Sequence, residues 1–255
     1  MSKSRVQQPG PALRYTIVRR TAVPSTNDEA KSLARAGAPP GTAVIAGAQT
    51  AGRGTKGRAW ASPPGLGLYL SVILELPAPA LALLPLAAGL AAREAVSRAA
   101  GLEAGLKWPN DLLWGGRKLG GILCESGFTG VELDYCVVGV GINVSQEAAD
   151  FPPELRDTAV SLRLAAGRPV AAAAVLDAFL PALEEWTARL AAEGGAAIAA
   201  AFAAAAVHKV GDLLLLDEGR GPFQARYEGI GPEGALLAAA SDGPRRFLAV
   251  DILSY

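Results

Sequence analysis

The alternation of apolar and polar positions divides the first 207 residues into strands and helices. Short apolar or alternating runs predict strands over residues 13–19, 42–48, 68–76, 105–108, 119–127 and 135–144. Apolar positions at helical spacing predict helices over residues 28–36, 83–100, 170–190 and 196–207. Ser25 or Thr26 can cap the first of these helices, and Gly101 closes the second. This order of elements predicts a mixed β-sheet with helices, an α+β fold.

The last fifty residues follow a different pattern. Short strands are expected over residues 211–217, 223–230, 235–240 and 247–252, separated by Gly, Pro and Asp turns. Such spacing predicts a small antiparallel β-module, with a barrel as one form of it. We therefore expect a loose tail over residues 1–12, a main domain over 13–206 and a C-terminal β-domain over 207–255.

Charge and rare residues narrow the classes of function. Lys+Arg and Asp+Glu both number 24 in the 255 residues. A nucleic-acid-binding protein usually carries a basic excess, so the balance argues against that class. Cys124 and Cys136 lie in apolar runs, which favours two free thiols over a disulfide. His208 is the single histidine, which argues against a His-based metal site or triad.

No segment predicts export or membrane insertion. Residues 1–11 are polar and lack the apolar core of a signal peptide. The uncharged stretch 76–92 is interrupted by three prolines, and the stretch 194–207 is too short to span a bilayer. We expect the cytoplasm as the location.

A glycine-rich basic loop follows the second predicted strand. Gly52 to Gly57 matches G-x-G-x-x-G, but Pro63, Pro64 and Gly65 prevent the helix that a dinucleotide fold requires. No G-K-[ST] occurs, which excludes a P-loop. Three cations among glycines, Arg53, Lys56 and Arg58, suit a phosphate or carboxylate. A solvated basic turn is the alternative for this segment.

Three further segments place charged or amide groups beside turns or glycines. The turn Lys107-Trp-Pro-Asn-Asp111 is expected to bring its two charged ends together at a sheet edge, where Asp111 suits Mg²⁺. Lys118 precedes Gly120-Gly121 in a strand, and residues 139–143 read Gly-Val-Gly-Ile-Asn. Glycines inside strands indicate close approach by a ligand or another backbone. A salt-bridged turn and a hairpin end with solvent-facing lysines are the alternatives.

Taken together, these motifs resemble the biotin protein ligases over residues 25–167, with weaker similarity beyond. The carriers are Ser25-Thr26-Asn27, Gln49-Thr-Ala-Gly-Arg-Gly-x-x-Gly-Arg-x-Trp60, Lys107-Trp-Pro-Asn-Asp111, Lys118-Leu-x-Gly-Ile-Leu123 and Gly139-x-Gly-Ile-Asn143. The resemblance implies a catalytic domain related to class II aminoacyl-tRNA synthetases and an SH3-like C-terminal β-barrel. It also implies two half-reactions: biotin and ATP give biotinyl-5′-AMP and pyrophosphate, and an acceptor lysine then takes the biotin.

The resemblance also assigns residues to roles. Biotin binding is assigned to Ser25, Thr26, Asn27, Gln49, Arg53, Gly54, Thr55, Lys118 and Gly121. ATP and adenylate binding is assigned to Arg53, Arg58, Trp60, Lys107, Asn110 and Asn143. Catalysis is assigned to Lys118, Arg53 and Asp111, with Asp111 as the candidate ligand of Mg²⁺. Lys118 would hold the biotin carboxylate while the mixed anhydride forms and breaks.

Two departures from the family pattern stand out. Many members begin with a DNA-binding domain, whereas here 12 residues precede the first predicted strand, so we expect the monofunctional form. The family usually has an arginine where this loop has Thr55, which predicts a leakier adenylate, partly offset by Lys56.

Other functions and partners remain open at this point. A lipoate or octanoate ligase of the same fold and a non-catalytic biotin-binding regulator are the alternatives. Polar residues 25–27 favour biotin, and an intact set of cations favours an enzyme. The expected acceptor is the biotin carboxyl carrier domain of a carboxylase. A homodimer through the sheet edge is compatible with the sequence, but no residue compels it.

Overall fold

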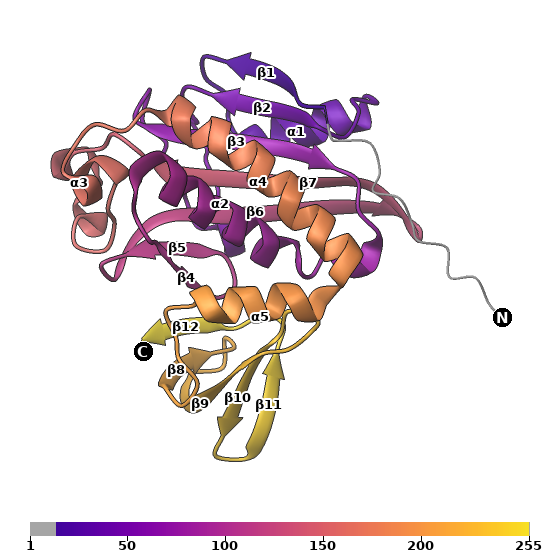
Figure 1. Cartoon of the computed structure of the whole chain (residues 1–255), viewed down its shortest axis with the longest axis vertical. Coiled ribbons are helices and arrows are strands. Elements are labelled where there is room, and N and C mark those ends of the chain that lie inside the picture. The colour runs from indigo at the N-terminus through magenta and orange to yellow at the C-terminus, as the bar shows by residue number, and fades with distance from the viewer. Residues whose placement is uncertain (1–13, 255) are drawn as a thin grey trace.

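The computed structural model describes residues 14–254 and contains two β-sheets (Figure 1). The larger sheet has the strand order β1-β2-β3-β7-β6-β5-β4. Its strands are β1 (Thr16–Arg20), β2 (Thr42–Ala46), β3 (Gly67–Leu74), β4 (Gly105–Lys107), β5 (Asp111–Trp114), β6 (Arg117–Thr129) and β7 (Glu132–Asn143). β1 pairs with β2 in parallel and the other neighbours pair antiparallel, which makes the sheet mixed, as predicted.

Helices cover both faces of this sheet. They are α1 (Thr26–Arg35), α2 (Leu84–Ala100), α3 (Leu162–Ala166), α4 (Ala172–Glu193) and α5 (Gly195–Ala205). Figure 1 shows α4 lying across α2, and α5 lying between the two sheets. Short 3₁₀ turns complete the set: η1 (Thr55–Gly57), η2 (Ala78–Ala80), η3 (Ala148–Asp150) and η4 (Pro153–Leu155).

The two faces of the sheet are buried in separate apolar clusters. Val72 and Val138 pack in the large core that includes α2 and α4. Their chain neighbours Ile73 and Val137 pack with Ala30 of α1 on the opposite face. Alternate side chains of a strand point to opposite faces, so a strand buried on both faces has a continuous apolar run. α1 covers part of its face, and the cavity described below opens on the rest.

The C-terminal sheet is antiparallel, with the strand order β11-β10-β9-β8-β12. Its strands are β8 (Leu213–Asp217), β9 (Pro222–Ile230), β10 (Leu236–Ala240), β11 (Gly243–Phe247) and β12 (Asp251–Ser254). The predicted C-terminal β-module is therefore confirmed as an antiparallel sheet. The two sheets part between Ala205 and Leu213. The predicted domain limit at residue 206 and the synthetase-like and SH3-like labels stay predictions.

Some predicted elements were wrong or missing. The strand predicted over 247–252 does not form, because Phe247 ends β11 and Asp251 begins β12. β5 was not predicted, since it has four residues and turns at once into β6. Gly115 and Gly116 make that turn with φ of 57° and 74°, backbone angles that glycine adopts without steric cost. The predicted tail over residues 1–12 lies outside the described residues.

Two simpler predictions concern the thiols and the membrane. Cys124 and Cys136 are both free, as expected. Within residues 14–254, no helix combines the length and the apolar character that a membrane crossing needs.

Candidate functional site

A cavity of about 760 Å³ opens between the large sheet, the glycine-rich loop and the C-terminal sheet. All fifteen residues predicted to bind biotin, nucleotide or Mg²⁺ or to act in catalysis line this cavity: Ser25, Thr26, Asn27, Gln49, Arg53, Gly54, Thr55, Arg58, Trp60, Lys107, Asn110, Asp111, Lys118, Gly121 and Asn143. The structure thus brings together motifs from distant parts of the sequence. Their individual roles toward ligands stay predictions.

Glycines in the central strands make room for side chains from elsewhere. Gly121 of β6 pairs with Gly141 of β7, and the indole of Trp60 lies over this pair. A methyl group at Gly141 would come within 2.6 Å of the Trp60 ring, and one at Gly139 would overlap Asn27 Oδ1. The sequence predicted close approach at these glycines by a ligand or by backbone. The structure instead places Asn27 and Trp60 there.

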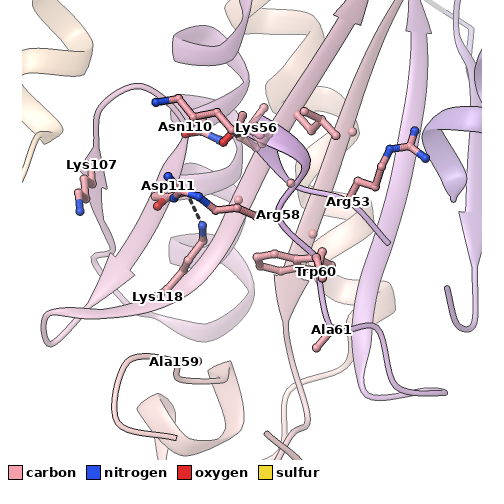
Figure 2. Close-up of a pocket in the computed structure, with 18 of the residues that line it drawn as sticks. Arg53, Lys56, Arg58, Trp60, Ala61, Lys107, Asn110, Asp111, Lys118 and Ala159 are labelled. Carbon is pink, nitrogen blue, oxygen red and sulfur yellow. Dashed lines mark hydrogen bonds and ion pairs between the residues drawn. The ribbon is translucent and has the colours of Figure 1, made fainter. Parts of the chain in front are cut away.

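Lys118, near the start of β6, lines the cavity. Its Nζ is 2.7 Å from Asp111 Oδ1 and 5.6 Å from the centre of the Trp60 ring (Figure 2). The Lys118 backbone donates to Thr158 O at 2.7 Å and accepts from Val160 N–H at 2.9 Å. Lys118 thus forms a parallel β-bridge with Ala159 in addition to its pairing with β5, and the two contacts fix the position of its backbone. The ammonium is therefore held by a carboxylate and an aromatic face at one point of the cavity.

Lys107 and Asp111 face each other across the β4–β5 hairpin at the sheet edge, as the turn predicted. Burial lowers the pKa of Lys107, and repulsion from Lys118 and Arg58 acts in the same direction, whereas Asp111 opposes it. The ammonium of Lys107 therefore loses its proton at a lower pH than an ordinary lysine.

Two asparagines predicted to contact nucleotide make structural hydrogen bonds. Asn110 Nδ2 donates to Ile122 O at 2.7 Å, and the backbone of the same two residues is also bonded. Asn143 Nδ2 donates to Val160 O at 3.1 Å and to Lys118 O at 3.4 Å. In the structure these amides hold the turn and the lysine in place.

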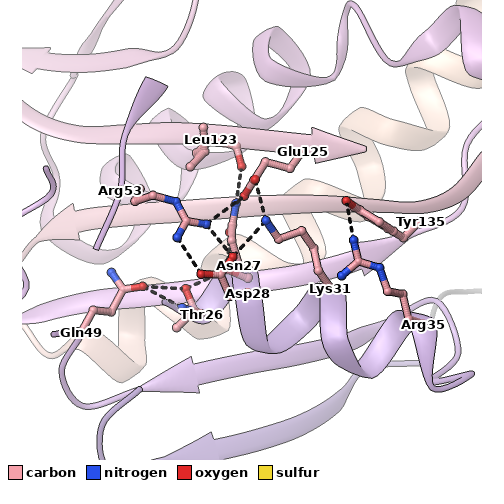
Figure 3. A network of polar contacts seen from close by, with 11 residues as sticks. Thr26, Asn27, Asp28, Lys31, Arg35, Gln49, Arg53, Leu123, Glu125 and Tyr135 are labelled. Carbon is pink, nitrogen blue, oxygen red and sulfur yellow. Dashed lines mark hydrogen bonds and ion pairs between the residues drawn. The ribbon is translucent and has the colours of Figure 1, made fainter. Parts of the chain in front are cut away.

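At the other end of the cavity, the predicted biotin residues form a hydrogen-bonded network (Figure 3). Gln49 Oε1 accepts from Thr26 N–H at 2.8 Å and lies 3.1 Å from Thr26 Oγ1, while its Nε2 donates to Ser62 Oγ at 2.9 Å. Ser71 Oγ lies within 2.8 Å of Thr26 Oγ1 and 2.6 Å of Asn27 Oδ1. These contacts determine which way each amide of Gln49 and Asn27 points.

Charged residues support that network from behind. Asn27 Nδ2 donates to Glu125 Oε2 at 2.6 Å, and Lys31 Nζ is 2.7 Å from Glu125 Oε1. Arg53 makes two hydrogen bonds of 2.6 Å to the carboxylate of Asp28. The bonds from Arg53 hold the pKa of Asp28 well below its usual range. Such a bidentate pair fixes both position and orientation.

Arg53 does not join Lys118 in the structure. It lies on the opposite side of Trp60 in Figure 2, and its guanidinium is paired with Asp28. Lys118 and Arg58 both act electrostatically on Lys107. In the structure Arg53 fastens the loop to α1, and its predicted roles toward biotin and the phosphate stay predictions.

Sequence reasoning missed Asp251, a charged residue of the cavity lining, and three residues outside the lining that hold lining side chains: Asp28, Ser71 and Glu125. Glu125 had a signal, since it is a lone carboxylate in an apolar strand. Asp28 was noted only as part of a helix start, and Ser71 resembles any small strand residue. Asp251 lies in the segment wrongly predicted as one strand. Its carboxylate contacts Lys56 and Arg58 of the glycine-rich loop.

The chain is similar in sequence to known proteins. The model of the Biotin/lipoate A/B protein ligase family matches residues 18–143. A Biotin–[acetyl-CoA-carboxylase] ligase of Paracoccus denitrificans is 34% identical over 238 residues, covering 89% of this chain and 96% of that protein. A Bifunctional ligase/repressor BirA of Bacillus subtilis is 36% identical over 230 residues, covering 89% of this chain and 70% of that protein.

A solved structure extends the similarity to three dimensions. The biotin protein ligase from Aquifex aeolicus, in complex with biotin and ATP, superposes with a TM-score of 0.81 at 27% identity. The match covers 94% of this chain and 99% of the other. The resemblance drawn from the motifs is confirmed on sequence and fold together, and the chain belongs to the biotin protein ligase family.

Proposed function

We propose that this chain adenylates biotin with ATP and transfers the biotin to a lysine of a biotin carboxyl carrier protein domain. Such an enzyme is of the biotin–[acetyl-CoA-carboxylase] ligase type, which the relatives support. The observation that carries the proposal is the division of one cavity into two ends. A hydrogen-bonding end lies beside α1, and a cationic end that includes Lys118 lies beside β4 and β5.

The chemistry follows from that division. In the first step, a carboxylate oxygen of biotin attacks the α-phosphorus of ATP, and pyrophosphate leaves. In the second, a neutral lysine amine of the acceptor attacks the acyl carbon, loses a proton and displaces AMP. Both steps gather negative charge near the acyl group, and Lys118 is positioned to offset it. Asp111 keeps that ammonium in place through the 2.7 Å ion pair.

Cations at the nucleotide end reduce the repulsion between the carboxylate and the triphosphate. Lys56, Arg58 and Lys107 line this end together with Lys118. No group of three or more His, Cys, Asp or Glu side chains within residues 14–254 forms a metal site. Mg²⁺ carried on ATP needs only one or two protein carboxylates, and Asp111 fits that requirement. Bound there, Mg²⁺ would neutralise phosphate charge.

The other end supports biotin over an aliphatic acid. The ureido ring of biotin offers one carbonyl acceptor and two N–H donors. Ser25, Thr26 and Gln49 line the cavity with hydroxyl and amide groups, and hydrogen bonds orient those of Thr26 and Gln49. A site built for hydrogen bonds rejects ligands that leave its polar groups unpaired. Octanoate and lipoate would leave them so.

Release of pyrophosphate from ATP tests this proposal. We expect release with biotin and none with octanoate or lipoate. Lys118→Ala should lower the rate by about 100- to 1,000-fold, the usual effect of losing one stabilising group. Lys209→Ala, in a loop before the C-terminal sheet, is the matched control and should keep the wild-type rate. Release with octanoate or lipoate alone would assign the chain to the lipoate branch, and no release with any acid would indicate a binding protein.

The acceptor is tested separately. We expect biotin to be transferred to a purified biotin carboxyl carrier domain and not to the same domain with its acceptor lysine changed to arginine. We also propose a cytoplasmic location and a homodimer. For the fold, we propose a synthetase-like catalytic domain and an SH3-like C-terminal domain.

A further inference from the structure

Asp251, the first residue of β12, contacts two cations of the glycine-rich loop. Its Oδ2 lies 2.8 Å from Lys56 Nζ, and its Oδ1 lies 2.6 Å from Arg58 Nη2. Each carboxylate oxygen thus takes one cation. Hydrogen bonds from Lys56 and then Arg58 lower the pKa of Asp251, so the carboxylate is charged at neutral pH. A phosphate group presents oxygens to two cations in the same way.

The glycine-rich loop adopts a conformation in which Lys56 and Arg58 both contact Asp251. Gly54 N–H donates to Arg58 O at 2.7 Å and Trp60 N–H donates to Gly52 O at 2.9 Å, which closes the loop on itself. Lys56 has φ of 56°, a left-handed conformation that side-chain-bearing residues rarely adopt. The loop keeps this conformation with its two cations on a carboxylate.

This contact lies at the nucleotide end of the cavity. Residues 248–253 line the cavity from the C-terminal sheet. Asp251, Arg58, Asp111 and Lys118 all act electrostatically on Lys107. This end therefore holds four cations, the two of the loop with Lys107 and Lys118, and two carboxylates, Asp111 and Asp251.

We propose that Asp251 is a positioning residue that takes the place of a phosphate: it holds Lys56 and Arg58 until a nucleotide triphosphate displaces it, and it recovers them when pyrophosphate leaves. The inference rests on the proposed function for the identity of the phosphate ligand. Asp251 and a phosphate carry charge of the same sign and share the same two cations, so they compete.

The solvent exposure of Lys56, Arg58 and Asp251 favours exchange of partners over permanent ion pairs. The side chains of Lys56 and Arg58 are 48% and 64% exposed, and that of Asp251 is 33% exposed. Ion pairs at such exposure are weak, so a triphosphate with more charge than one carboxylate displaces Asp251 at small cost. The Arg53–Asp28 pair, with two hydrogen bonds, keeps the other end of the loop attached to α1 during the exchange.

Binding of inorganic tripolyphosphate, measured by calorimetry without biotin, tests the competition. Asp251→Asn keeps the shape of the side chain and removes its charge. We expect tripolyphosphate and ATP to bind the variant about 5- to 30-fold more tightly, since two weak ion pairs no longer compete. Pyrophosphate should inhibit the variant at correspondingly lower concentrations, and kcat should fall while KM for ATP falls with it.

Two variants serve as controls. Glu218→Gln removes one charge from the same sheet, where Glu218 pairs with Arg245, and should leave tripolyphosphate binding unchanged. Asp251→Glu keeps the charge and should restore wild-type binding. Unchanged or weaker binding of tripolyphosphate by folded Asp251→Asn would overturn the inference, as would an equal gain in Glu218→Gln. Because no biotin is present, this result is independent of which acid the enzyme activates.

Discussion

The two ends of the cavity hold their polar groups in different ways. Beside α1, Ser71 joins the side chains of Thr26 and Asn27. Gln49 accepts from the backbone N–H of Thr26, and Asn27 donates to the backbone of β6. Asp28 holds Arg53 by two hydrogen bonds. At the nucleotide end, exposed Lys56 and Arg58 share one carboxylate. The first end has a set shape, whereas the second has charges that can change partners.

This difference matches the demands on each end. A small neutral ring is recognised by a few hydrogen bonds of fixed direction, which favours preorganised amides. A triphosphate brings several negative charges into the site, and part of it must leave as pyrophosphate. This favours cations that bind the triphosphate but exchange partners easily enough to release the pyrophosphate. One loop serves both, because Arg53 and Arg58 lie at its two ends.

Gly139→Ala should disrupt the hydrogen-bonding end of the cavity beside α1. The added methyl overlaps Asn27 Oδ1 and displaces an amide that three partners hold. We expect biotin affinity to fall about 100-fold, the scale of a 1 Å misplacement, while tripolyphosphate affinity stays constant. Calorimetry with each ligand measures both.

The matched control is Gly89→Ala in α2, where a methyl group meets only ordinary contacts with Leu106 and Phe202. It should bind both ligands as the wild type does. If Gly139→Ala kept wild-type biotin affinity, the amide of Asn27 would have no part in shaping that end.

Alkaline pH should weaken ligand binding at the nucleotide end of the cavity and leave binding at the end beside α1 unchanged. Burial lowers the pKa of Lys107, with Lys118 and Arg58 adding to the effect and Asp111 and Asp251 opposing it. Lys107 therefore becomes neutral as the pH rises through its lowered pKa, and phosphate binding loses one cation. We expect ATP affinity to fall about tenfold as the pH rises through this lowered pKa, before an ordinary lysine would lose its proton.

Biotin affinity should remain constant over the same range, because Asp28, whose pKa is lowered, stays ionised there. Lys107→Arg, which keeps its charge, should remove the alkaline loss of ATP affinity. A parallel loss for both ligands, or no rescue by arginine, would count against a separate role for Lys107.

Thr55→Arg should produce the smallest change, at the junction of the two ends. Thr55 replaces the arginine usual in the family, and the side chain lines the cavity. An added cation should slow release of the adenylate about 2- to 5-fold, the scale of one exposed ion pair. Release of labelled adenylate in a chase experiment measures it, with Thr55→Lys as a variant of equal charge. An unchanged rate would mean that Thr55 does not make the intermediate leak.

The sequence predicted the central parts of this molecule better than its edges. β7 was expected over residues 135–144 because its apolar run suits a strand buried on both faces, and the structure confirms it. β5 and β11 failed because they are short strands near the edges of their sheets, formed largely by pairing with a neighbour. Local pattern carries little information about such strands.

The candidate site divides in the same way. Lys107 and Asp111 were expected to meet because a single turn joins them, and the hairpin register brings them face to face. The partners of Gly139 and Gly141 come from Asn27 and Trp60, far away in sequence. Asp251 requires the whole C-terminal sheet to be docked before it reaches the loop. Contacts that depend on strand order and docking have no local signal in the sequence.

The position of β12 also matters for anyone who handles the protein. Asp251 begins this strand, Leu253 lines the cavity, and β12 ends at Ser254. An affinity tag or fluorescent fusion attached directly after β12 would start a few residues from the nucleotide end of the cavity. Binding and inhibition constants measured on such a fusion would include the charge and bulk of the attached segment, so a removable tag is the better choice.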